Sequence, residues 1–285
     1  GIASSGGAGR VTAEWMINGY MNEDLYSLDI KRFQKFHSSK KFIMNRVTES
    51  LGDLYGMHWP YKQHKTSRNQ KLLPYHEDLK KVGACFGQSG EYERPMWYAL
   101  DEIKPKYEYS FNYQNWYPSV EHECKNTIEN VGLFELSPFS KYEIKGEKAY
   151  QELQRLCTAN IKQEIGKCTY THMLNEGAGI ETDLTVVCVD KNYFRIISSA
   201  TVRTHDKAHI LKHLSKDIEF KDVTDELICL GVFGPKSRDL LSKITKDDLS
   251  NENFKFGTGK NINIDDIKVW AQRISYVGEL GFELY

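Results

Sequence analysis

The chain of 285 residues has no excess of charge of either sign and no long apolar run. It carries 38 basic and 39 acidic residues, which leaves a net charge of −1. A surface that binds nucleic acid or an anionic membrane needs a basic excess, so neither kind of partner is expected. No apolar run approaches the roughly 20 residues that cross a bilayer. We therefore expect neither nucleic-acid binding nor a membrane span.

Several catalytic and metal-binding motifs are also missing. The sequence has no C-x-x-C pair, no G-x-S-x-G elbow and no Walker loop. Its six cysteines are isolated, and no spacing supplies one of them with a base. They are typical of reduced core thiols in a cytoplasm or a mitochondrial matrix. His205, His209 and His213 share one helix face, but the glutamate of H-E-x-x-H is absent. We expect that face to be solvated, and we expect no metal.

What is present predicts an ordered α+β protein. Hydrophobic residues make up 40% of the chain and charged residues 27%, which is enough apolar material for a packed core. Hairpins dominate over β-α-β units after residue 119, so the sheet is expected to be mainly antiparallel. The hydrophobic periodicity predicts helices at 119–130, 147–157, 204–214 and 234–244, and strands within 131–146, 168–174, 180–190, 192–199, 227–234 and 269–285.

The first 118 residues are less regular. A small-residue loop with Gly6, Gly7 and Gly9 precedes a helical pattern that ends near Gly19. Glycines before a helix let a ligand approach backbone N–H groups, although a tight turn explains them equally well. Residues 35–118 are rich in aromatic side chains and proline and contain few long periodic segments. We interpret them as an ordered connecting domain, since flexible linkers rarely hold so many Trp and Tyr residues.

The stretch GIETDLTVVCVD, residues 179–190, contains a carboxylate in the middle of an expected strand. Alternation places Asp183 on the same face as Thr185, Val187 and Val189. An ionised carboxylate on an apolar face is costly unless it is paired. Either this face is half solvated or Asp183 has a function.

Two strand carboxylates and two tyrosines are candidates for one binding site. Tyr170 lies on the strand expected to pair with that of Asp183, and Tyr276 and Glu283 lie in SYVGELGFELY. A carboxylate can accept from two adjacent N–H donors of a heterocycle such as a pterin, and Tyr rings can flank a flat ring system. The alternative, that Asp183 and Glu283 are solvated strand residues, is about as well supported by the spacing.

The motifs together resemble a known family. VGLFELSPFSKYEIKG, YTHMLNEGAGIETDLTVV, GPKSRDLL and RISYVGELGFELY are similar to the folate-binding domain of aminomethyltransferases, the T-proteins of glycine cleavage. The first 33 residues resemble the end of an amine-oxidising FAD domain. MHWPYKQH and ACFGQSGEYERPMWYA resemble the central domain of sarcosine and dimethylglycine dehydrogenases. The resemblance implies three parts: the tail of an FAD-binding domain (1–34), a central domain (35–118) and a truncated aminomethyltransferase-like domain (119–285).

The resemblance also implies roles for individual residues. Asp183 matches the aspartate beside the reactive nitrogen of tetrahydrofolate, and a desolvated carboxylate there would be a good general base. Tyr170 and Tyr276 match tyrosines that contact folate, and Glu283 matches the glutamate that holds the pterin ring. The loop with Gly6, Gly7 and Gly9 matches a segment near the flavin ring.

The implied whole protein oxidises an N-methyl amine of the sarcosine or dimethylglycine type with FAD and passes the one-carbon unit to tetrahydrofolate. An electron acceptor is a further partner. Thr182 stands where transferases often carry a second acid, which favours the dehydrogenase branch. The alternatives are a folate-dependent aminomethyltransferase without redox activity and a non-catalytic regulatory homologue. The chain begins without Met and stops within an expected strand, so we expect a fragment that binds FAD mostly through residues upstream.

Overall fold

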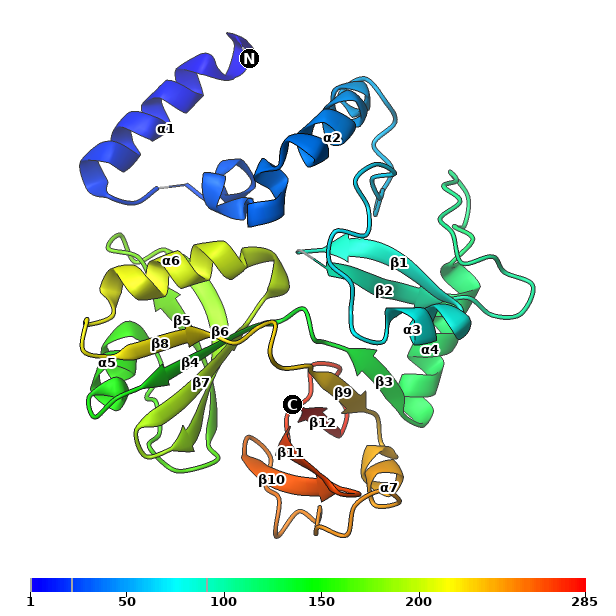
Figure 1. Ribbon diagram of the computed structural model, residues 1–285, viewed down its shortest axis with the longest axis vertical. Coiled ribbons are helices and arrows are strands. Elements are labelled where there is room, and N and C mark those ends of the chain that lie inside the picture. The colour runs from blue at the N-terminus through cyan, green and yellow to red at the C-terminus, as the bar shows by residue number, and fades with distance from the viewer. Residues whose placement is uncertain (1, 22, 91) are drawn as a thin grey trace.

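The chain forms two five-stranded antiparallel sheets with helices packed around them, as described by a computed structural model for residues 2–21, 23–90 and 92–285 (Figure 1). The expected α+β class with mainly antiparallel sheets is confirmed. The α-helices are α1 (Ser5–Asn18), α2 (Lys40–Asp53), α3 (His76–Lys81), α4 (Tyr117–Glu129), α5 (Ala149–Leu156), α6 (Arg203–His213) and α7 (Ser237–Leu241). The 3-10 helices are η1 (Ile2–Ser4), η2 (Tyr26–Leu28), η3 (Ile30–Arg32), η4 (Lys35–Ser38) and η5 (Ala200–Val202).

One sheet, here called the β6 sheet, has the strand order β5-β6-β7-β4-β8. The expected hairpin around residues 175–179 joins its strands β5 and β6, and a tight turn then joins β6 to β7. Strand β6 is therefore paired on both sides, and its alternate side chains must point to opposite faces of the sheet. The strands are β4 (Ser140–Lys145), β5 (Cys168–Leu174), β6 (Ile180–Asp190), β7 (Tyr193–Ser198) and β8 (Glu219–Asp222).

The second sheet, here called the β12 sheet, has the order β10-β11-β12-β9-β3. The segment 131–146, expected to hold two strands, contributes β3 to this sheet and β4 to the other, so the two do not pair with each other. The strands are β3 (Gly132–Glu135), β9 (Leu230–Phe233), β10 (Gly259–Ile264), β11 (Ile267–Gln272) and β12 (Gly281–Leu284). A separate hairpin consists of β1 (Ala84–Ser89) and β2 (Tyr92–Tyr98).

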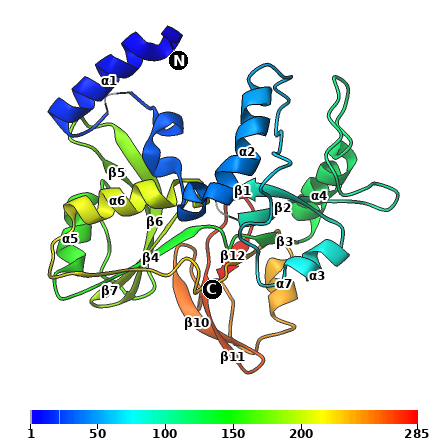
Figure 2. The ribbon, with the colours of Figure 1, turned by 45° about the horizontal axis from the view of Figure 1, so that its top comes forward.

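The two faces of the β6 sheet are buried by different partners. Helices α5 and α6 cover one face, where Leu153 and Ile210 pack with Leu184 and Val186 of β6. The other face meets the β12 sheet, where Val187 packs in a cluster with Trp270, Ile274 and Tyr285. Figures 1 and 2 show α6 lying across the sheet, with α1 beyond it. Burial on both faces fixes the register of β6, because a one-residue slip would exchange the two sets of side chains.

One expectation for the first 118 residues is wrong. Gly6, Gly7 and Gly9 do not form a loop, because α1 begins at Ser5 and includes them. The helix does end at Gly19, which adopts φ +80°, as glycine readily does after a helix. The segment after residue 35 contains α2, a helix of 14 residues that the sequence did not reveal. Its buried side is narrow, so the apolar periodicity is weak: only Phe42 is buried.

The six cysteines are free, and five of them are buried. Within the three described ranges, no helix is both long and apolar enough to cross a membrane.

We predict that Gly166→Ala strongly destabilises the protein. Gly166 adopts φ +87°, and a Cβ there would lie 2.3 Å from the carbonyl oxygen of Gly259, at the junction of the two sheets. The contacting atoms belong to the backbone and can move apart only at a high energetic cost. We therefore expect a loss of about 3 kcal/mol in the free energy of unfolding. Gly278→Ala is the matched control, because Gly278 has φ +79° but open space around it. The control should lose only about 1 kcal/mol. Equal losses in chemical denaturation would show that the contact between the sheets is unimportant.

Candidate functional site

Strands β5 and β6 bring Tyr170 and Asp183 into direct contact. The two strands pair in antiparallel register, with Tyr170 opposite Thr185 and His172 opposite Asp183. These four side chains share one face of the sheet. The hydroxyl of Tyr170 donates to Oδ2 of Asp183 over 3.1 Å. Oδ1 of Asp183 has no hydrogen-bond partner among the described residues, so it is available to a ligand.

The face that carries Asp183 changes from buried to solvated along the strand. Val187 is buried and Thr185 half-buried, whereas Asp183 is exposed. The face that carries Asp183 is therefore half solvated, as one of the two explanations for a carboxylate in this strand expects. The expected desolvation of Asp183 is not provided by the described residues, because β5 is the edge strand and the β12 sheet covers only the Val187 end of this face.

Glu283 lies in a different environment from Asp183. It sits on β12, is only 6% exposed, and its Oε2 accepts a hydrogen bond of 2.7 Å from the hydroxyl of Tyr285. Burial raises the pKa of Glu283, because the charged form loses hydration that a single hydrogen bond does not replace. Its Oε1 has no hydrogen-bond partner in the part of the chain that the structure describes. A buried carboxylate with an open acceptor suits a ligand that offers N–H donors.

A short chain of contacts connects Glu283 to Tyr170. Cys168 lies two residues before Tyr170 on the same face of β5, and its thiol is 3.8 Å from Oε1 of Gln272, the cross-strand neighbour of Glu283. Burial and then the charge of Glu283 raise the pKa of Cys168 to about 12. The edge of the β6 sheet thus lies against β11 and β12, although the four predicted site residues do not line one apolar pocket.

Tyr276 is 90% exposed in the turn between β11 and β12. Partial desolvation, the Asp183 carboxylate and then Tyr276 raise the pKa of Tyr170, which itself is 59% exposed. Tyr276 is therefore within electrostatic range of Tyr170. The two exposed phenol rings and the Asp183 carboxylate form a solvated, aromatic, anionic surface.

His172 is a site residue that the sequence reading missed. It is the direct cross-strand neighbour of Asp183, and its ring meets the ring of Tyr170 edge-on at 5.4 Å. Alternation along 168–174 already places His172 on the face of Tyr170, but only the register of the hairpin puts it opposite Asp183. That register depends on one extra residue in β6, which the sequence pattern does not reveal.

The histidine face of α6 is not solvated, which corrects the expectation. His205 is 9% exposed, and its Nε2 lies 2.9 Å from Oε2 of Glu181 while its Nδ1 lies 3.3 Å from Oδ1 of Asp206. Hydrogen bonds with Asp206 and Glu181 raise the pKa of His205 to about 9, against the effect of burial. Burial lowers the pKa of His209 to about 4, so that ring is neutral near pH 7. The sequence pattern failed because the N-terminal segment packs against this helix.

A cavity of about 560 Å³ lies between the N-terminal segment and α6. Its lining is mixed: Tyr26 and Asp29 come from the N-terminal segment, Glu181 from β6, and His205 and His209 from α6. Neither Asp183, Tyr170, Tyr276 nor Glu283 lines it. The cavity is therefore a second feature, lined by the N-terminal segment, the β5–β6 hairpin and α6.

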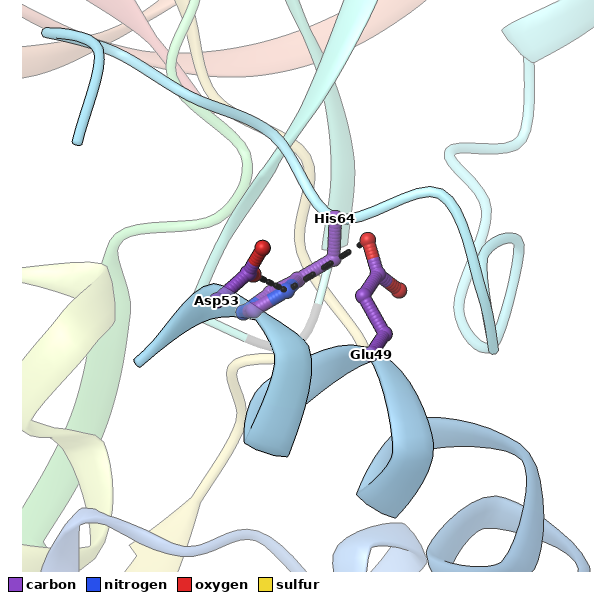
Figure 3. A group of neighbouring side chains, drawn as sticks. All are labelled: Glu49, Asp53 and His64. Atoms are coloured by element: carbon purple, nitrogen blue, oxygen red, sulfur yellow. Dashed lines mark ion pairs between the residues drawn. The ribbon is translucent and has the colours of Figure 1, made fainter. Parts of the chain in front are cut away.

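Two carboxylates and one histidine form a further group of side chains that could bind a metal ion. Glu49, Asp53 and His64 offer ligand atoms within 4.8 Å of one another, and Figure 3 shows the His64 ring between the two carboxylates. The Glu49 oxygens, however, already accept from the backbone N–H groups of Lys65 and Thr66. The hydrogen bond from the Thr66 hydroxyl and these two backbone bonds outweigh burial and lower the pKa of Glu49 to about 2.

Asp53 in turn pairs with Lys62 at 2.5 Å. Both carboxylates of the group therefore have partners in the segment 62–66. These contacts hold the segment 62–66 against α2, and this structural role accounts for the group without a metal.

Comparisons with known proteins agree with the resemblance. Residues 75–285 match the GCVT N-terminal domain, and residues 18–72 match the FAD dependent oxidoreductase central domain. These two ranges meet near residue 74. They do not test the division into residues 1–34, 35–118 and 119–285, which stays a prediction.

Two curated relatives are similar over the whole chain. One is the 4-methylaminobutanoate oxidase (formaldehyde-forming) of Paenarthrobacter nicotinovorans, with 39% identity, and the chain covers 35% of it. The other is the mitochondrial dimethylglycine dehydrogenase of Rattus norvegicus, with 33% identity and 33% of its length covered. The chain thus spans about a third of the length of these relatives.

Among solved structures, the glycine cleavage system aminomethyltransferase T of Bartonella henselae is similar, with a TM-score of 0.62 and 25% identity. The match covers 76% of this chain and 53% of that one. The two chains therefore share a fold over the matched part.

We predict that His205 makes stability depend on pH. The pKa of His205 is raised in the folded protein, so its contribution is fully present below its unfolded pKa of about 6.5 and is lost as pH rises through about 9. The wild type should lose about 2 kcal/mol of unfolding free energy between about pH 7 and pH 9.5 that His205→Gln does not lose. His213→Gln is the control and should keep the loss. Parallel pH profiles of the wild type and His205→Gln in chemical denaturation would contradict the assignment.

Proposed function

The chain belongs to the family of the GCVT N-terminal domain, and from this premise we propose that it is part of a flavoprotein that oxidises an N-methyl amine and passes the one-carbon unit to tetrahydrofolate. The proposal covers the full-length protein. The observation that carries it is the hydrogen-bonded pair of Tyr170 and Asp183 on the exposed face of β5 and β6, within the matched domain.

The match of residues 18–72 to the FAD dependent oxidoreductase central domain supports the redox part. So do the names of the two relatives, an oxidase and a dehydrogenase, each similar along the whole chain. A transferase without redox activity has no need of that segment. The proposed amine is small and methylated, and the proposed co-substrate is tetrahydrofolate.

When bound, FAD supplies a hydride acceptor that turns the amine into an iminium, and tetrahydrofolate supplies the amine that captures this electrophile. Asp183 would orient the capturing amine and take its proton at Oδ1. Tyr170 would hold Asp183 through Oδ2, which leaves Oδ1 free for this role. Without capture the iminium reacts with water and releases formaldehyde.

Other residues of the chain are suited to contact tetrahydrofolate or FAD. Glu283, buried and with Oε1 free among the described residues, would accept from the pterin N–H groups. Tyr276 offers a second exposed aromatic ring within electrostatic range of Tyr170. Near the N-terminal end of α1, a Cβ built on Gly6, Gly7 or Gly9 meets no atom of the described residues outside the helix within 4 Å. That open surface would allow close approach of FAD, which we assign mainly to residues of the full-length protein outside this chain.

The partners of the full-length protein would be a methylated amine, tetrahydrofolate and an electron acceptor. Its compartment would be the cytoplasm, or the mitochondrial matrix in a eukaryote. Two other functions remain as alternatives, a folate-dependent aminomethyltransferase without redox activity and a non-catalytic regulatory homologue.

One spectroscopic experiment separates these functions. The full-length protein is purified, and its visible spectrum is recorded without oxygen before and after addition of sarcosine, dimethylglycine or 4-methylaminobutanoate. A flavin spectrum that bleaches with one of these amines is the expected result. A protein without flavin would favour the transferase or the regulatory homologue, and a flavin that none of the amines reduces would overturn the proposed substrate class.

We predict that Asp183→Asn uncouples the two reactions. The variant keeps the shape of the side chain but loses the base, so capture by tetrahydrofolate should fall about 10²-fold while amine oxidation stays within about twofold of wild type. Free formaldehyde and methylene-tetrahydrofolate are quantified in the same assay. Asp190→Asn, at the other end of β6, is the control and should remain coupled. An equal fall in amine oxidation would refute the assigned role.

We predict that Glu283→Gln weakens folate binding without weakening the fold. Loss of a charge-assisted hydrogen bond should raise the Kd for tetrahydrofolate at least about tenfold. Because burial raises the pKa of Glu283, the neutral amide should leave the melting temperature unchanged or slightly higher. Isothermal titration calorimetry and thermal unfolding measure the two effects. Unchanged affinity would exclude Glu283 from the folate site.

A further inference from the structure

Strand β6 carries a β-bulge immediately before Asp183. Met173 pairs with Thr182, but the next residue, Leu174, pairs with Ile180, so Glu181 has no partner on β5. Strict alternation would place Glu181 on the face of Asp183. A bulge adds one residue to one strand and redirects the side chains around it. As a result, two consecutive residues, Glu181 and Thr182, both reach α6, and Asp183 points to the opposite face.

Glu181, which the bulge redirects, and its neighbour Thr182 are bonded to adjacent residues of α6. Oε2 of Glu181 lies 2.9 Å from Nε2 of His205, and Oγ1 of Thr182 donates to Oδ2 of Asp206 over 2.9 Å. Asp206 and His205 are joined in turn by the contact of 3.3 Å between Oδ1 and Nδ1. The closed set of Glu181, His205, Asp206 and Thr182, here called the bulge clamp, ties β6 to α6 directly beside Asp183.

Three of the four residues of the bulge clamp are buried, and the fourth, Glu181, is half-buried. Asp206 is fully buried and Thr182 is 6% exposed. The hydrogen bond between them is therefore not easily exchanged for a bond to water. Asn175 Nδ2 donates to Oε1 of Glu181 over 3.0 Å, which also fixes the hairpin end of the strand. Charged hydrogen bonds in such surroundings are stronger and better directed than exposed ones. The strand segment before Asp183 is therefore restrained in position and in direction.

Asp183 itself lacks such restraint. It is exposed, and Tyr170 is its hydrogen-bond partner among the described residues. Its backbone position is consequently set by the residues before it. The rate of capture depends on this backbone position, because a misplacement of the carboxylate by about 1 Å can lower the rate about 10²-fold.

We propose that the bulge clamp is a positioning device that aims Asp183 at the one-carbon acceptor, with Thr182 and Asp206 as its key positioning residues. The proposal rests on the proposed function and adds residues to it. None of the four clamp residues touches the reacting atoms in this account; they act through the direction of β6. Thr182 serves here as the donor to the buried carboxylate of Asp206.

Two variants of Thr182 in the full-length protein test the proposal. Thr182→Val keeps the shape but removes the hydroxyl, and Thr182→Ser keeps the hydroxyl. In Thr182→Val, capture by tetrahydrofolate should fall about tenfold, with its KM changed less than about twofold. Amine oxidation should remain within about twofold of wild type. Thr182→Ser should restore capture. This split between kcat and KM, with rescue by serine, is not expected if Thr182 only stabilises the fold.

Asp206→Asn provides a second, independent variant if Thr182→Val does not fold, and should lower capture in the same way. His213→Gln, on the same helix but without a bond to β6, is the matched control and should leave capture unchanged. Equal capture in Thr182→Val and wild type, or an equal loss in the valine and serine variants, would overturn the positioning role. A wild-type protein that does not transfer a one-carbon unit at all would instead overturn the proposed function, so the two failures are distinguishable.

Discussion

The double pairing of β6 is the constraint on which the rest of the structure depends. Because β5 and β7 flank this strand, its backbone groups are used and its side chains must alternate between a helix-covered face and a face toward the β12 sheet. Leu184 and Val186 face the helices, and Val187 meets the residues of the other sheet. A one-residue slip would exchange these two sets of side chains between the faces. The strand is therefore a rigid support for the residues at its exposed end.

Three carboxylates near this strand show how position decides chemistry. Glu181 is half-buried and bonded to His205, which lowers its pKa to about 2. Glu283 is buried with one hydrogen bond, so its pKa is raised. Asp183 is exposed and shares one hydrogen bond with Tyr170. The same functional group thus serves as a fixed ion-pair partner, as a buried acceptor and as a solvated carboxylate, because burial and partners differ.

The bulge at Glu181 connects these roles. It converts simple alternation into two consecutive contacts with α6 and leaves Asp183 on the other face. The cost is a residue without a strand partner, which the hydrogen bonds of Asn175 and His205 offset. Departures from regular structure, such as this bulge, are expected beside functional sites, where the placement of a side chain takes precedence over regular strand pairing.

Several strands, the end of one helix and the pairing of two candidate site residues could be predicted from the sequence. Apolar runs and alternation between turn residues identified β5, β6 and β7, and glycine at residue 19 marked the end of α1. These signals depend on local sterics and on side-chain burial. The side-chain pattern also brought Tyr170 and Asp183 onto neighbouring strands. What only the tertiary structure decided was the environment. His205 is buried because the N-terminal segment packs on α6, Glu283 is buried because two sheets meet around Tyr285, and Asp183 is exposed because it lies beyond that junction. Burial, register and the bulge depend on residues far apart in the chain, and no local pattern carries that information.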